Sequence, residues 1–116
     1  MSEEELPPQI REQLLRLQQM QQTLQTIVTQ KQQLELELAE AEKAISELEK
    51  VDEGTDVYKS VGSILLKADR QSLINELKER KELLNTRVTV LSRQEERTRV
   101  KIKELQERLQ ERLKSP

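Results

Sequence analysis

The chain has 116 residues, of which 36% are charged and 1% aromatic, and its formal net charge is −2. It contains no Phe, Trp, Cys or His, which excludes disulfides, thiol chemistry and histidine-based catalysis, and its mainly aliphatic apolar residues favour a narrow helical seam over a wide core. The acidic start MSEEELPP has no apolar signal segment and no apolar run reaches the roughly 20 residues that cross a bilayer, so we expect a cytoplasmic protein without membrane contact.

The first predicted element is a helix at about residues 8–51. Pro7 and Pro8 suit its first turn, where a backbone N–H has no intrahelical partner, and the sequence VDEGTD ends it. Spacings of three and four alternate over about six heptads, which predicts a coiled-coil helix. Its seam positions are Ile10, Gln13, Leu17, Met20, Leu24, Ile27, Lys31, Leu34, Leu38, Ala41, Ile45 and Leu48.

A β-hairpin is predicted next, at about residues 55–68. The segment VYKSVGSILLK alternates around Val61-Gly62, which indicates two short strands. Val61 disfavours the positive φ of a type I′ turn, so we expect a three-residue loop with Gly62 in the left-handed region.

The predicted hairpin is apolar on both faces, with Val57, Ile64 and Leu66 on one side and Tyr58 and Leu65 on the other. A lone two-stranded hairpin is marginally stable, and its edges offer unpaired backbone groups to another strand. We therefore expect the hairpin to join other hairpins; the alternative is a cap folded back on its own helices. The predicted oligomerisation residues are Val57, Tyr58, Val61, Gly62, Ile64, Leu65 and Leu66.

The second long helix is predicted at about residues 70–114, with Asp69 as its N-cap. Its seam also runs for about six heptads. The seam positions are Ile74, Leu77, Lys81, Leu84, Val88, Leu91, Glu95, Thr98, Ile102, Leu105, Leu109 and Arg112. Lys31, Glu95 and Thr98 fall in neighbouring layers, where we expect weaker packing; the alternative is polar insertions that fix the register.

A short connection favours an antiparallel helix pair. Residues 1–50 carry ten acids and five bases and residues 69–116 carry nine acids and thirteen bases, which suits such pairing. The predicted core pairs are Leu17 with Leu105, Met20 with Ile102, Leu34 with Val88 and Leu38 with Leu84. The predicted flanking ion pairs are Glu42 with Lys78 and Glu37 with Arg87.

No catalytic constellation or cofactor site is predicted. Asp52, Glu53 and Asp56 could bind a metal, as at the acidic tip of transcript-cleavage factors, but the apex sequence VGSI is apolar and a solvated turn is favoured. Basic residues between Arg93 and Lys103 are interrupted by glutamates, which favours a solvated flank over a nucleic-acid surface.

Two coiled-coil helices joined by one β-hairpin resemble the β-type subunits of prefoldin. The residues that carry the resemblance are LEKVDEGTDVYKSVGSILLKADRQSLINELKER, 48–80, with Tyr58 and Gly62 in the hairpin. The resemblance implies one prefoldin-like domain over residues 1–116 and a hexamer of two α and four β subunits, whose hairpins form inter-subunit β-barrels. It also implies an ATP-independent chaperone that delivers non-native proteins to a group II chaperonin. The alternative is a structural spacer or tether without client binding.

Client binding is expected at the distal end, residues 10–24 and 98–113. Leu15 and Val100 fall on the outward face there and Leu14 and Leu113 on the flank, positions that coiled coils usually keep polar. The alternative is that these residues only close the coiled coil. The predicted client-binding residues are Ile10, Leu14, Leu15, Leu17, Met20, Leu24, Val100, Ile102, Leu105, Leu109 and Leu113.

Overall fold

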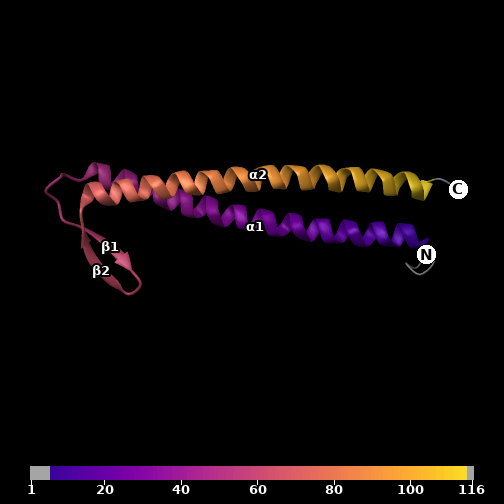
Figure 1. Cartoon of the computed structure of the whole chain (residues 1–116), viewed down its shortest axis with the longest axis horizontal. Coiled ribbons are helices and arrows are strands. Elements are labelled where there is room, and N and C mark those ends of the chain that lie inside the picture. Colours follow the sequence, from indigo (N-terminus) through magenta and orange to yellow (C-terminus); the bar gives the residue numbers. More distant parts are fainter. Residues whose placement is uncertain (1–5, 115–116) are drawn as a thin grey trace. The chain divides into compact units, whose positions relative to one another are not determined.

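The computed structural model describes residues 6–114 and contains two long helices with a two-stranded antiparallel sheet between them in the chain (Figure 1). The elements are α1, Pro8–Lys50; β1, Val57–Val61; β2, Ile64–Ala68; and α2, Arg70–Lys114. The predicted fold class, an α-helical chain with one β-hairpin between its helices, is confirmed.

The chain divides into two compact units, and both long helices contribute to each. We call residues 6–31 with 90–114 the distal unit, and residues 32–89, which include the hairpin, the proximal unit. Within each unit the two helices run antiparallel. Residues later in α1 contact residues earlier in α2. The contacts are Gln13 with Arg112 and Lys31 with Glu95 in the distal unit, and Glu37 with Arg80 and Leu48 with Arg70 in the proximal unit.

The start of α1 follows from its two prolines. The Pro7 carbonyl accepts hydrogen bonds from the backbone N–H groups of Ile10 and Arg11, at 3.0 and 3.1 Å. Pro8 then occupies the first helical position, where its missing N–H removes no helical hydrogen bond.

Asp69 caps the start of α2, as predicted. Its Oδ2 accepts a hydrogen bond from the Ser72 backbone N–H at 2.9 Å, and its carbonyl accepts one from the Leu73 N–H at 2.9 Å. The hydrogen bond from Ser72 lowers the pKa of Asp69, because it stabilises the ionised carboxylate.

Arg70 links the start of α2 to the end of α1. Its Nε donates a hydrogen bond to the Leu48 carbonyl at 2.9 Å. The last carbonyls of a helix have no intrahelical donor, so this contact satisfies one of them. It also joins the end of α1 to the start of α2, the two points between which the hairpin segment is inserted.

The hairpin turn is tighter than the sequence predicted. Val61 pairs with Ile64, so only Gly62 and Ser63 form the loop, and the predicted three-residue loop is wrong. Gly62 has φ of 59° and Ser63 does not have a positive φ, which is the φ pattern of a type II′ turn with Gly at its first central position. A Cβ on Gly62 would have no atom within 4 Å, so backbone conformation rather than space requires glycine there.

The predicted seams form the cores of the two units. Every seam position on α1 is buried or half-buried, and so is every one on α2 except the exposed Arg112. The core is narrow, because no described side chain is less than 2% exposed. The buried apolar residues are Ile10, Ile27, Ile102, Leu105 and Leu109 in the distal unit, and Ala41, Ile45, Ile74 and Leu84 in the proximal unit.

Both flanking ion pairs predicted from the sequence are wrong. Lys78 lies 3.9 Å from Glu49 instead, and Glu37 lies 4.0 Å from Arg80. Exposed pairs of long side chains contribute about 0–1 kcal/mol, so several partners are nearly equivalent and the apolar seam sets the register.

Candidate functional site

The β-hairpin has two apolar faces, as predicted. Residues opposite one another on paired strands share a face, so the register places Val57, Val61, Ile64 and Leu66 on one side, and Tyr58 with Leu65 on the other. In this chain Leu65 is 71% exposed and Tyr58 57%. On the first face Ile64 is 54% and Leu66 49% exposed, so neither apolar face is buried against the chain's own helices.

Both strands of the hairpin are also edge strands. The sheet contains only β1 and β2, so the outer side of each strand presents backbone N–H and C=O groups without a ladder partner. An apolar surface with open edges can be extended by strands from other chains. This chemistry suits assembly and offers no catalytic group.

Two exposed ion pairs involve the hairpin lysines, and one of them reaches α2. Lys59 Nζ lies 2.7 Å from Glu76 Oε1 on α2, and Lys67 Nζ lies 3.2 Å from Asp56 Oδ1 beside the strands. The Lys59–Glu76 pair is thus a polar contact between the hairpin and α2, while the apolar side chains of the hairpin stay largely exposed.

Several predicted client-binding residues pack into one apolar cluster in the distal unit. Ile10, Leu105 and Leu109 form its buried centre, with relative exposures of 9%, 6% and 4%. Leu6, Leu14, Leu17 and Met20 pack around that centre and are only half-buried. The contact of Leu17 with a cluster containing Leu105 agrees with the predicted register.

Other predicted client-binding residues lie on the surface of the distal unit. Leu15 is 55% exposed, Val100 50% and Leu113 58%, whereas Ile102 is buried and Leu24 half-buried. The structure thus separates the predicted set into a packed centre and exposed apolar positions.

Sequence reasoning missed three further exposed apolar residues. Leu36 and Leu83 of the proximal unit are 56% and 53% exposed, and Val90 of the distal unit is 45% exposed. Each is a large aliphatic residue outside the seam positions, and that signal could have identified them.

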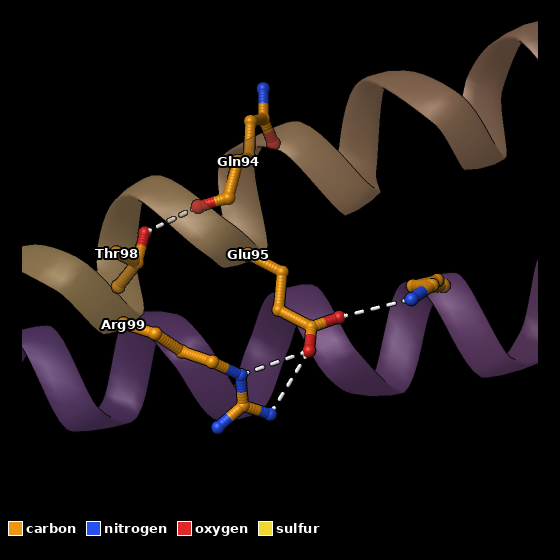
Figure 2. Close-up of polar contacts among 5 residues, drawn as sticks. Gln94, Glu95, Thr98 and Arg99 are labelled. Atoms are coloured by element: carbon orange, nitrogen blue, oxygen red, sulfur yellow. Dashed lines mark hydrogen bonds and ion pairs between the residues drawn. The ribbon is translucent and has the colours of Figure 1, made fainter.

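A polar layer interrupts the apolar core of the distal unit. Glu95 Oε1 accepts a hydrogen bond from Lys31 Nζ at 3.2 Å, and Glu95 Oε2 accepts one from Arg99 Nε at 3.0 Å. Figure 2 shows the Glu95 carboxylate facing the Arg99 guanidinium, and the Thr98 hydroxyl nearby donates to the Gln94 carbonyl at 2.8 Å. The hydrogen bond from Arg99 has the largest effect on the pKa of Glu95 and lowers it, and the hydrogen bond from Lys31 lowers it further. At this layer a carboxylate paired with two basic side chains takes the place of apolar packing.

Among residues 6–114, no three acidic, histidine or cysteine side chains gather closely enough to hold a metal ion. In the same part of the chain, neither helix combines the length and the hydropathy that crossing a membrane requires.

Comparison with known proteins relates this architecture to one family. Residues 11–116 match the family model described as prefoldin subunit. Prefoldin subunit beta of Thermococcus onnurineus is 46% identical, with 90% of each chain covered, and that of Archaeoglobus fulgidus is 47% identical, with 91% of each covered. The crystal structure of the prefoldin beta subunit from Thermococcus strain KS-1 matches with a TM-score of 0.86 at 42% identity, covering 95% of this chain and 96% of that one. The chain therefore belongs to the prefoldin family, which is a family of chaperone subunits and not of enzymes.

Proposed function

We propose that this chain is the β-type subunit of a prefoldin hexamer with two α and four β subunits. In that complex it would hold non-native proteins without ATP and deliver them to a group II chaperonin. The observation that carries the proposal is the likeness to beta subunits across at least nine-tenths of the chain, including the hairpin that distinguishes this fold from a plain coiled coil. We further propose that the protein is cytoplasmic, which its lack of cysteine fits, since disulfides are rare in that compartment. We also propose that residues 1–116 act as one domain.

The hairpin would be the joint between subunits. Its open edges can pair with neighbouring strands, and its exposed apolar side chains would gain burial in a β-barrel. Burying a Leu or Ile side chain contributes ~1.5–3 kcal/mol, so several such residues per subunit would stabilise an oligomer. The residues proposed for this role are Val57, Tyr58, Val61, Gly62, Ile64, Leu65 and Leu66.

The distal unit would capture clients. Its half-buried residues around the centre of Ile10, Leu105 and Leu109 need little movement to contact an apolar chain segment, and Met20 adds a flexible, polarizable contact. Leu15, Val100 and Leu113 would extend this surface outward. A non-native protein presents varied apolar segments, which suit shallow and adaptable contacts better than one shaped pocket.

Two measurements on one preparation test the proposal. The full-length chain, co-expressed with an α-type prefoldin subunit, should give a native mass of two α and four β subunits. The same preparation should suppress aggregation of a chemically denatured protein equally well with and without ATP. A monomeric chain without aggregation suppression would instead support the structural spacer, and suppression that requires nucleotide would contradict the proposed mechanism.

A further inference from the structure

The two units of the chain carry opposite charge. The described residues of the distal unit include eleven basic and six acidic side chains, whereas residues 32–89 of the proximal unit include nine basic and thirteen acidic ones. Residues 17–30 of α1 contain no charged side chain, and eight of the eleven basic side chains of the distal unit lie on α2. The proposed client surface is therefore apolar and basic together.

Two adjoining grooves in the distal unit combine these properties. The first, of ≈ 370 Å³, lies between the helices and has Met20 and Leu105 among its lining residues. The second is a shallow, open depression between side chains of α2 beside Val100. Lys101 and Glu104 line both grooves. The remaining charged lining residues are Arg16 and Arg108 in the first groove, and Arg93, Glu96 and Arg97 in the second.

The basic residues of these grooves make no ion pair within the described part of the chain. Arg93, Arg97 and Lys101 follow one another at intervals of four along α2, and like charges at that spacing destabilise a helix. Within the described residues, none of these three, nor Arg16 or Arg108, makes an ion pair within 4.0 Å. All five side chains are exposed and available to an external carboxylate.

We propose that the distal unit selects non-native segments in which apolar side chains are flanked by Asp or Glu. The inference rests on the proposed client-capture function and specifies its substrate class. Apolar client side chains would contact Met20, Leu105 and Val100, while client carboxylates would accept hydrogen bonds from the surrounding Arg and Lys side chains. Charge-assisted hydrogen bonds of this kind are stronger than neutral ones, and a basic surface accelerates the approach of acidic segments.

The chemistry of the grooves favours a polypeptide over a nucleic acid. Single-stranded nucleic acids stack their bases on aromatic side chains, and the described distal unit contains none, because the sole aromatic residue is Tyr58 in the hairpin. Glu96 and Glu104 also lie among the basic residues, where they would repel a continuous phosphate backbone.

The test uses the assembled complex and three fluorescent peptides that share one apolar centre and carry Glu, Gln or Lys on both sides. Fluorescence anisotropy at low salt should show the Glu peptide binding at least tenfold more tightly than the Lys peptide, with the Gln peptide between them. Raising the salt concentration should shrink this difference, because exposed charges are screened. Equal binding of all three peptides would overturn the charge selection and leave the chaperone function standing. Failure of every peptide to bind would overturn client capture itself.

A matched pair of variants locates the effect. R97Q/K101Q/R108Q removes basic residues from both grooves and should reduce the Glu-over-Lys preference to less than twofold, with native mass unchanged. K43Q/K50Q/R87Q removes the same charge from the proximal unit and should keep the preference. Loss of preference in the proximal variant would show a long-range charge effect and overturn the assignment to the grooves. Competition by a single-stranded RNA oligonucleotide as effective as that of the unlabelled Glu peptide would also overturn it.

Discussion

The helical seams and the β-hairpin use the same aliphatic residues in opposite ways. Seam residues such as Leu84 and Leu109 are 3% and 4% exposed, whereas Ile64 and Leu65 in the hairpin are 54% and 71% exposed. A long amphipathic helix satisfies its own backbone hydrogen bonds and needs only one partner stripe, which the second helix of the same chain supplies. A two-stranded hairpin has two faces and two edges, and the described part of this chain has no further strand to cover them. The chain thus buries the apolar surface of its helices by itself, and leaves the apolar surface and the strand edges of its hairpin for other chains to cover.

The largest expected effect comes from breaking the hairpin as a joint. I64K/L66K should prevent assembly with the α-type subunit, because charges buried in a barrel would be desolvated and apolar burial would be lost. Light scattering should show smaller particles with unchanged helical circular dichroism. Q21K/Q22K adds the same charge at exposed positions on α1 and should assemble normally. Normal assembly of the hairpin variant would show that the subunits join elsewhere.

Truncating one leucine in each region sharpens the contrast. Leu105→Ala removes a side chain that is 6% exposed and should lower the free energy of unfolding by ~2–3 kcal/mol, near the low end for core leucines because the seam is narrow. Leu65→Ala should leave the unfolding of the isolated chain within about 0.5 kcal/mol of the wild type while weakening assembly. Urea titrations followed by circular dichroism measure the first effect, and native mass the second. Equal losses of chain stability would remove the distinction between the regions.

The two glycines give a smaller, local comparison. Gly62→Ala should destabilise the hairpin by about 1–2 kcal/mol, because Ala is strained at a φ of 59°. Gly54 has no positive φ, and a Cβ at that position would have no atom within 4 Å, so Gly54→Ala should be nearly neutral. Amide hydrogen exchange across residues 57–68 measures the opening of the hairpin. Equal exchange in the two variants would contradict the assigned turn.

The smallest expected effect concerns the polar layer. The pKa of Glu95 is lowered in the folded chain, so its ionised form adds stability above its ordinary pKa, and that stability is lost as pH falls through the lowered value. Glu95→Gln should therefore lower the melting temperature at neutral pH and match the wild type in strong acid. Glu96→Gln, at an exposed neighbouring position, serves as the control. A melting-temperature difference between Glu95→Gln and wild type that does not change with pH would mean that the charge of Glu95 is not responsible.

Much of this architecture could be predicted because its signals are local. Heptad spacing identified the buried seam positions, and alternation within VYKSVGSILLK identified both faces of the hairpin. Asp69 could be recognised as a cap from its position before a periodic segment. These features depend on neighbours within a few residues, so the sequence contains nearly all the information.

The errors share a different physical origin. The loop length depended on whether the residues flanking Gly62 and Ser63 pair across the hairpin, and the structure pairs Val61 with Ile64. The partners of Glu37 and Lys78 depended on flexible exposed side chains with several charges in reach. The client-binding and oligomerisation residues remain predictions, because they concern chains outside this one.

The most direct test of the central claim is photo-crosslinking from the two regions in the assembled complex with a denatured client bound. A photoreactive amino acid replacing Val100 should cross-link to the client, whereas the same residue replacing Leu65 should cross-link to neighbouring subunits. Adding excess unlabelled client should abolish the first product and leave the second unchanged. Client cross-links from position 65, together with subunit cross-links from position 100, would contradict the division of this chain into an assembling hairpin and a client-binding distal unit.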